Sequence, residues 1–323
     1  SEVYINSKKV ENDKVLKTAI DYFNNDSFWL IAPYKIFNAG TERSIVKHQG
    51  KDALLITYTS GGSTPGDSYL WILDENYYPT SFKMWTSIIP IGGVSGTWSH
   101  WKNTEAGIKL PTKHTLSIFG LEINMGNVKA YNVKANQLAD KILKAINHKA
   151  YKETKFLEWS FAGKRSFQWD KVNHIVNVSW DDFRVNLHPE NLEKSTVFFK
   201  DERQEDTDEK VVKRAWDIFN NDSFWLVAPY NVFDEGVERR LVNGNDLLVT
   251  YNESNSSKQN SYLWKLDKEG KPNAVKMWTS LLPIDGLEAS WTDWIVTETG
   301  AQLPTNHKFI FGNLGIDNIK TKL

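Results

Sequence analysis

The sequence contains one long segment twice, and this duplication restricts the fold more than any other feature. The eight residues 23–30 recur without a change at 219–226. Shorter matches follow at a similar spacing of about 193–196 residues, among them 32–34 with 228–230, 68–71 with 261–264, and 83–87 with 276–280. Agreement over that distance indicates a structural unit of about 190 residues that is used twice.

The two copies differ in length. Residues 1–4 align with 195–198, so the match reaches the first residue, whereas residues 136–194 have no earlier counterpart. We therefore expect a first unit at 1–135 that lacks its N-terminal helix and strands, and a complete second unit at 136–323. A trimmed chain and a naturally partial unit both explain the difference. Trimming is favoured, because an incomplete sheet exposes an unpaired edge.

Hydrophobic periodicity predicts a fold dominated by strands. Apolar residues at helical spacing over 138–146 predict a helix, and alternating apolar residues over 157–187 predict four antiparallel strands. Helical spacing returns over 212–219, and the apolar stretch 224–230 predicts a second, short helix before about six further strands. The pattern therefore predicts a mainly β (α+β) fold. We expect two tandem curved antiparallel sheets, or half-barrels, each with short apolar helices plugging its concave face.

Composition excludes several classes of function. The chain has no cysteine, so it contains no disulfide, thiolate metal site or cysteine nucleophile. Its net charge of -1 gives no reason to expect nucleic acid or an anionic membrane surface as a partner. It also lacks the serine-hydrolase elbow, the phosphate-binding glycine loop and the zinc-protease motif. We expect a protein that is not an enzyme and that holds no metal and no cofactor.

Two polar residues recur at informative positions. His114 matches His307, and a structural role is favoured over that of a ligand or base, because no second His or paired carboxylate recurs nearby. Asp26 matches Asp222 just before the apolar stretch, where capping of a helix is favoured over acid–base catalysis. The glycine-rich segment 61–66 has an unrelated counterpart and predicts a flexible hairpin loop.

Two pairs of indoles also recur and are candidates for ligand contact. Trp98 and Trp101 match Trp291 and Trp294, and each pair follows a Pro-Ile-x-Gly turn and precedes a Leu-Pro-Thr turn. The chain is rich in aromatic residues, with 14 Trp, 16 Phe and 12 Tyr. Such pairs can stack on sugar rings, line an acyl cavity, or pack in the core where the sheet curls. Core packing is the favoured interpretation.

The order of elements resembles that of the periplasmic lipoprotein carriers of the LolA and LolB type. A Phe-Trp-Leu-x-x-Pro helix combined with Trp-rich strands is also similar to uncharacterised bacterial secreted proteins. The resemblance covers the second unit and most of the first. It implies an open half-barrel that holds acyl chains between the sheet and the helical plug. The implied plug residues are Phe28, Trp29, Leu30, Pro33 and Tyr34 in the first copy, and Phe224, Trp225, Leu226, Pro229 and Tyr230 in the second. These residues apart from the two prolines, together with the indoles Trp98, Trp101, Trp291 and Trp294, are the candidate ligand contacts.

Residue patterns and resemblance together predict a non-enzymatic protein of the bacterial cell envelope, periplasmic or associated with the outer membrane. We expect it to bind an apolar ligand, such as a lipid or acyl chain, or a segment of an envelope protein. Two alternatives stay open: a structural or assembly subunit of an envelope complex, and a carbohydrate-binding protein that uses exposed tryptophans. Membrane attachment is expected only through a lipid anchor ahead of residue 1, since no apolar run reaches the ~20 residues of a membrane span.

Overall fold

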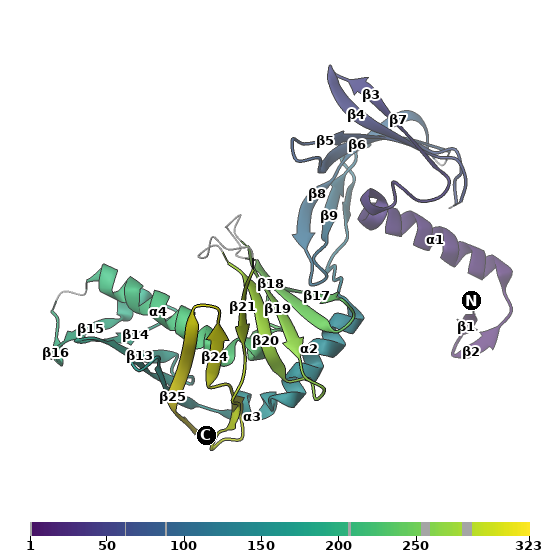
Figure 1. The fold of residues 1–323 in the computed structure, drawn as a ribbon. Helices are drawn as coiled ribbons and strands as arrows, with labels where there is room; N and C mark the ends of the chain where they lie inside the picture. Colours follow the sequence, from purple (N-terminus) through teal and green to yellow (C-terminus); the bar gives the residue numbers. More distant parts are fainter. Residues whose placement is uncertain (1, 62, 88, 206–207, 253–258, 280–285) are drawn as a thin grey trace. The chain divides into compact units, whose positions relative to one another are not determined.

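The computed structural model describes residues 2–61, 63–87, 89–205, 208–252, 259–279 and 286–323. Contacts divide the chain into two compact units: residues 1–104 and 108–130 form the first, and residues 105–107 and 131–323 form the second. The boundary expected from the repeat, between 135 and 136, falls inside the helix α2 (Val133–Ala145) near the start of the second unit. Most of the regular structure is antiparallel strand, which confirms the predicted mainly β fold (Figure 1).

One large sheet organises the second unit. Its 13 described strands pair antiparallel in the order β16-β15-β14-β13-β12-β11-β25-β24-β21-β20-β19-β18-β17. These strands are β11 (Phe156–Phe161), β12 (Arg165–Asp170), β13 (Ile175–Trp180), β14 (Phe183–Leu187), β15 (Thr196–Phe199), β16 (Glu202–Arg203), β17 (Val237–Val242), β18 (Asp246–Asn252), β19 (Gln259–Leu266), β20 (Pro272–Trp278), β21 (Leu287–Ser290), β24 (Asn306–Phe309) and β25 (Gly312–Lys322). A separate small hairpin consists of β22 (Ile295–Val296) and β23 (Gln302–Leu303).

Alternation of side chains explains why these segments are strands. In β11, Leu157, Trp159 and Phe161 are buried, and the intervening Glu158 and Ser160 are half-buried. The long strand β25 pairs with β24 on one side and with β11 on the other. It thereby joins the meander β11–β14 to the C-terminal strands in the predicted single curved sheet (Figure 1).

The helices of the second unit lie against this sheet. They are α2, α3 (His148–Glu153) and α4 (Glu209–Val227), with 3-10 turns η2 (Leu192–Lys194) and η3 (Ala228–Asn231). Helix α4 packs on β13, β14 and β15 and buries Val212, Ala215 and Phe219. The apolar stretch 224–230 is the end of α4 together with η3, and not a helix of its own.

The predicted helix break before the apolar stretch is wrong in both copies. Helix α4 is capped by Asp208 and runs unbroken, and α1 (Asp13–Ile31) is capped by Asn12 and also runs unbroken. Asp222 therefore caps nothing: it lies within α4 with no exposed surface, and its Oδ2 is 2.7 Å from Nε of Arg165. The Asp222 carboxylate is thus satisfied by the Arg165 guanidinium and not by the backbone N–H groups of a helix start.

The described residues of the first unit form three antiparallel sheets. They are the pair β1 (Val3–Ile5) and β2 (Lys8–Val10); the set β3 (Thr41–His48), β4 (Lys51–Tyr58), β5 (Ser68–Leu73), β6 (Pro79–Thr86) and β7 (Ile89–Thr97); and the set β8 (Ser99–Asn103), β9 (Lys109–Thr115) and β10 (Glu122–Asn124). Helix α1 and the 3-10 turn η1 (Ala32–Tyr34) complete it. Trp71, Phe82 and Trp98 form the centre of its core. Residues 61 and 63–66 lie between the paired strands β4 and β5, as predicted for a hairpin loop, and residue 62 lies outside the described residues.

The predicted turns around the first pair of indoles are wrong. Residues 90–93 fall within β7, although none of them has a partner in the register of β7 with β6. Residues 110–112 belong to β9, which pairs with β8. The register shifts between Met84 and Thr86 of β6, whose partners are Val94 and Ile89, so the Pro-Ile-Gly-Gly sequence forms an irregularity within the strand and not a turn between two strands. In the second unit, residues 283–285 lie outside the described residues, and Pro304 and Thr305 lie between β23 and β24, as expected of a turn.

Candidate functional site

The residues predicted as a plug close the core of the second unit. Trp225 and Leu226 are buried and Phe224 is half-buried; the Trp225 ring centroid lies 5.4 Å from that of Trp291. Tyr230 stacks on Tyr151 at 3.9 Å between centroids. Its hydroxyl lies 2.7 Å from the carbonyl oxygen of Ile146 and accepts a hydrogen bond from the N–H of Gln302. These contacts join α4 and η3 to the surrounding elements as core packing.

The same aromatic arrangement recurs in the first unit but is more open. The ring centroids of Phe28 and Tyr69 are 4.6 Å apart, as are those of Phe224 and Tyr262. Phe28, Trp29 and Leu30 are only half-buried, however. Tyr34 is 50% exposed where its equivalent Tyr230 is 4% exposed. The predicted plug thus leaves part of its surface open in the first unit.

Both repeated histidines are structural. His114 and His307 have no exposed surface, and Nδ1 of each lies about 3 Å from a backbone carbonyl oxygen, of Thr97 (3.0 Å) and Ser290 (3.1 Å). Burial lowers the pKa of His307 to about 4, against the opposing effect of nearby carbonyl groups. The imidazole is therefore neutral at pH 7, and its ring packs 4.2 Å from that of Trp291 between centroids.

The indole pairs divide into an enclosed and a partly exposed member. Trp98 and Trp291 are buried, and Trp98 stacks on Trp71 at 5.2 Å between centroids. Trp101 is half-buried beside Tyr78 at 5.6 Å. Trp294 is also half-buried, and its Nε1–H lies 3.1 Å from the carbonyl oxygen of Pro272. A sugar-stacking platform needs an exposed ring face, which Trp98 and Trp291 do not offer.

A groove of about 820 Å³ runs along α1 and the neighbouring sheet of the first unit. Its apolar lining consists of Tyr22, Phe28, Trp29, Tyr58, Tyr69, Met84 and Ile89. Its polar lining includes Lys17, Asp21, Asn24, Asn25, Lys35, Ser63, Thr64 and Asp67. Of the residues predicted as ligand contacts, the structure brings Phe28 and Trp29 to this groove; the others do not line it.

Polar contacts fix the rim of the groove. Ser63 donates a hydrogen bond to Asp21 at 2.6 Å, and Asn24 donates one to Ser63 at 3.1 Å, so the β4–β5 loop is tied to α1. Lys17 forms an ion pair with Asp21 at 2.8 Å, and the hydrogen bonds from Lys17 and Ser63 lower the pKa of the Asp21 carboxyl. On the apolar floor, burial raises the pKa of the Tyr69 hydroxyl, which stays neutral. The groove is thus apolar at its floor and charged at its edge.

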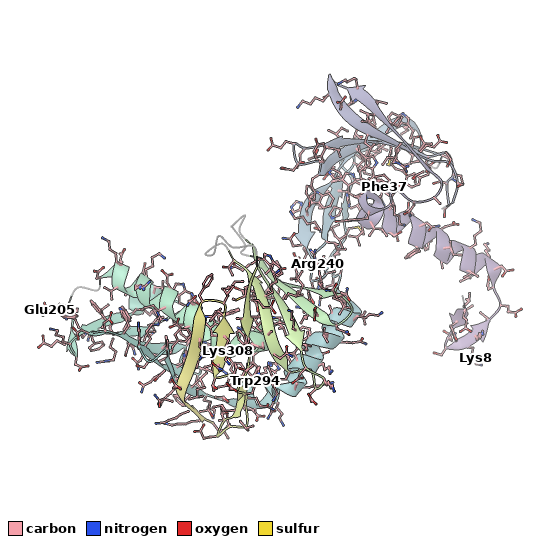
Figure 2. The ribbon with its side chains drawn as sticks, in the orientation of Figure 1. Lys8, Phe37, Glu205, Arg240, Trp294 and Lys308 are labelled. Atoms are coloured by element: carbon pink, nitrogen blue, oxygen red, sulfur yellow. The ribbon has the colours of Figure 1, made fainter. Side chains whose placement is uncertain are left out.

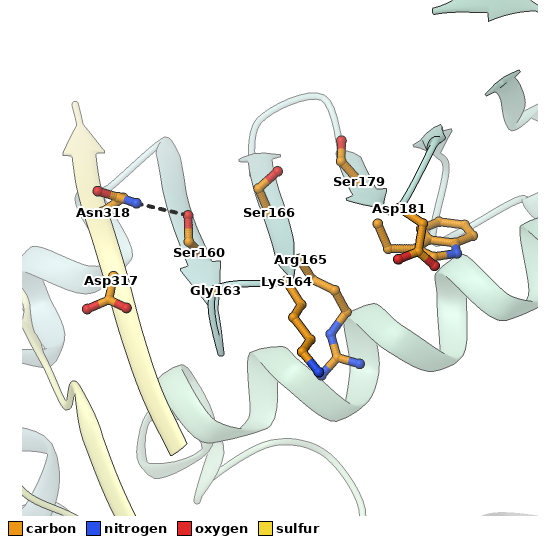
Figure 3. Close-up of a pocket in the computed structure, with 10 residues that line it drawn as sticks. Ser160, Gly163, Lys164, Arg165, Ser166, Ser179, Asp181, Asp317 and Asn318 are labelled. Atoms are coloured by element: carbon orange, nitrogen blue, oxygen red, sulfur yellow. Dashed lines mark hydrogen bonds between the residues drawn. The ribbon is translucent and has the colours of Figure 1, made fainter. Parts of the chain in front are cut away.

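A second, smaller hollow of about 350 Å³ lies on the second unit and is mainly polar. In Figure 3, Lys164 and Arg165 extend toward a helix, whereas Ser166 and Ser179 point away from it. Arg165 reaches Asp222, and burial raises the pKa of that carboxyl to about 6 despite the ion pair. Asp222 has no exposed surface, so it cannot touch a substrate and acts in packing.

Sequence reasoning missed one repeated feature that the structure exposes. The tripeptide Ile-Phe-Gly occurs at 118–120 and again at 310–312, each time in the connection between two paired strands. Phe119 is 100% exposed and Phe311 is 79% exposed. Phe119 also has a φ of 54°, a conformation that non-glycine residues rarely adopt. The recurrence of the tripeptide was the signal that could have identified these hairpin tips.

Comparison with protein family models, curated proteins and solved structures finds no significant match. Within the described residues, no three His, Asp or Glu side chains gather as a metal site would require. No described helix is long and apolar enough to cross a membrane.

Proposed function

We propose that this chain is a non-catalytic binding protein whose first unit holds an apolar ligand in the groove beside α1. The observation that carries the proposal is the groove itself, about 820 Å³ with an aromatic floor and a charged rim. Sites for small molecules commonly occupy roughly 300–1,000 Å³ and combine an apolar lining with a few polar groups. A single acyl chain with a polar head fits this chemistry.

The difference between the two units supports placing the ligand in the first. In the second unit, the residue equivalent to Tyr22 is Ile218, which is buried, and the equivalent of Tyr34 is the buried Tyr230. In the first unit, Tyr22 is exposed at the groove. One copy of the repeat therefore has a closed core, whereas the other offers apolar surface to a ligand.

The proposed location is the bacterial cell envelope, and it rests on the resemblance to LolA- and LolB-type carriers in the order of elements. The groove also favours an apolar ligand over a sugar, because its aromatic rings line a concave space. The enclosed Trp98 and Trp291 present no open ring face on which a sugar could stack. An assembly role is the second candidate. It is favoured by an uncovered face of α1, which is a separate feature from the groove.

Binding of cis-parinaric acid, a fluorescent fatty acid, tests the proposal directly. We expect saturable enhancement of its fluorescence on addition of the 323-residue chain. Asn25→Trp places an indole in the groove, where Asn25 is an exposed lining residue, and we expect at least about tenfold weaker binding. Native mass spectrometry after extraction from bacterial membranes identifies the bound lipid.

Ala19→Trp is the matched control, because it adds the same side chain to the same helix at an exposed position that does not line the groove and that lies on the side of Phe23, away from Asn25. This variant should bind like the unmodified chain. Absence of saturable binding, or equal loss in both variants, contradicts the proposal.

A further inference from the structure

The two units share an order of strands that is interrupted in the first. Along the second unit's sheet the order is β16-β15-β14-β13-β12-β11-β25-β24. By sequence, β2 and β1 of the first unit correspond to β16 and β15, and β10 and β9 correspond to β25 and β24. Among the described residues of the first unit, nothing corresponds to the meander β11–β14. The first unit therefore has the two strand pairs that would flank the meander, β1–β2 and β9–β10, without the four strands between them.

Both strands that flank this gap have a free edge. Strand β15 pairs with β14 as well as β16, whereas β1 pairs with no described strand except β2. Strand β25 continues to Lys322 along β11, whereas β10 ends at Asn124 and pairs with β9 alone among the described strands. A free strand edge presents backbone N–H and C=O groups that another strand can pair with.

One face of helix α1 is uncovered, whereas the meander β11–β14 covers the same face of α4 in the second unit. In the second unit, Phe219 is 6% exposed and lies 5.3 Å from Trp169 of β12 between ring centroids. It also lies 6.4 Å from the rings of Trp159 and Phe167. Its equivalent Phe23 is 66% exposed. Helix α1 buries none of its residues. The β4–β5 loop bonds to it on the groove face, at Asp21 and Asn24, and the N-terminal end of the helix extends past the sheet β3–β7 (Figures 1 and 2).

A charged residue lies on the same face. Asp222 of α4 is fully buried against Arg165, which comes from the start of β12. Its equivalent Asp26 is exposed. Burial of a carboxylate is favourable only when a cation or strong hydrogen-bond donor accompanies it. The cover of α1 must therefore bring a basic side chain to Asp26, as β12 does for Asp222.

This open face differs from the groove face of the helix. With 3.6 residues per turn, Phe23 and Asp26 lie on one side of α1, and the groove residues Asp21, Asn25 and Phe28 lie on the other. A partner on the open face and a ligand in the groove can bind together. Docking of a partner on the open face is consequently independent of the proposed ligand.

We propose that the first unit is a docking site for a four-stranded antiparallel meander with the side-chain pattern of β11–β14. One outer strand of the meander pairs with β10 and the other with β1. Its inward aromatic row covers Phe23 and neighbouring apolar residues of α1, and an arginine at its second strand pairs with Asp26. The partner is thus a polypeptide segment of this type, distinct from residues 156–187, which already cover α4.

A chain that carries a second copy of residues 136–194 directly ahead of Ser1 tests the proposal, because it reproduces the junction of Lys194 with Ser195. We expect amide hydrogen exchange in α1 and β1 to slow by about tenfold or more relative to the 323-residue chain. Asp26→Asn should then lower the melting temperature of the first unit in the extended chain and leave it unchanged in the 323-residue chain.

A matched extension carrying Trp159→Ser, Phe167→Ser and Arg165→Gln in the copied segment only serves as control. It should leave exchange in α1 as fast as in the 323-residue chain. Unchanged exchange with the unmodified extension overturns the proposal, and so does equal protection by both extensions. Dimerisation of the 323-residue chain that protects α1 also overturns it, since the cover would then be a second copy. Parinaric acid binding is measured separately, so failure of the ligand proposal is distinguishable.

Discussion

At the scale of single residues, His307 links acidity to the stability of the second unit. Burial lowers its pKa to about 4 in the folded state, whereas an unfolded histidine titrates near 6.5. As pH falls below about 6.5, the unfolded state takes up the proton first, so the free energy of unfolding decreases. We expect His307 to account for a loss of about 3 kcal/mol between pH 7 and pH 4. Urea unfolding at a series of pH values measures this loss.

Comparison with His307→Gln isolates the histidine from other groups. Asp222 acts in the opposite sense, because its raised pKa of about 6 makes the folded state bind a proton first between about pH 6 and pH 4. The difference between the two proteins removes this contribution. An equal dependence on pH in both proteins shows that His307 does not titrate as described.

The role of a residue was predictable where its recurrence and its neighbours in sequence determine that role. The structural role of His114 and His307 follows from their recurrence without a nearby partner, and both are buried. The role of Asp222 was not predictable, because its partner Arg165 lies far away in sequence and meets it only when β12 packs on α4. A local pattern of Asn, Asp and Ser resembles a cap, and tertiary packing overrides it.

At the scale of elements, α1 and α4 have almost the same apolar stripe in different surroundings. Phe219→Ala removes a ring from a packed core, and we expect it to cost about 3–5 kcal/mol of unfolding free energy in the second unit. Phe23→Ala changes an exposed side chain, and we expect an effect within about 0.5 kcal/mol. Chemical denaturation of both variants measures the difference. Similar losses in the two variants contradict an open face on α1.

Alternation predicted the strands of the second unit well, and proline and glycine predicted turns less reliably. The row Leu157, Trp159 and Phe161 is buried as expected, because one face of the meander meets α4. Residues 110–112 read as a turn from their Leu-Pro-Thr sequence but form β9, since pairing with β8 tolerates Pro111. The groove was not predictable from periodicity. It arises because the α1 residues Phe28 and Trp29, with the loop held by Ser63, line a concave space.

At the scale of the whole molecule, the duplication predicted two units, and the structure gives them unequal cores. The buried cluster around Trp71 and Trp98 in the first unit is much smaller than the cluster around Trp159, Trp264 and Trp291 in the second. Stability of a domain grows with the apolar surface that it buries. We therefore expect the first unit to be the less stable of the two. The sequence indicates part of this difference, because the first copy has no counterpart of residues 136–194 and so lacks equivalents of Trp159 and Phe167.

Calorimetry should consequently resolve two unfolding transitions, with the first unit melting at the lower temperature. The equivalent residues Trp71 and Trp264 assign them, because both are essentially fully buried. Replacing a core indole by a smaller ring leaves a cavity, which costs about 1–3 kcal/mol. We expect Trp71→Phe to shift only the lower transition and Trp264→Phe to shift only the upper one. A single transition that both variants shift equally shows instead that the two cores unfold as one cooperative structure.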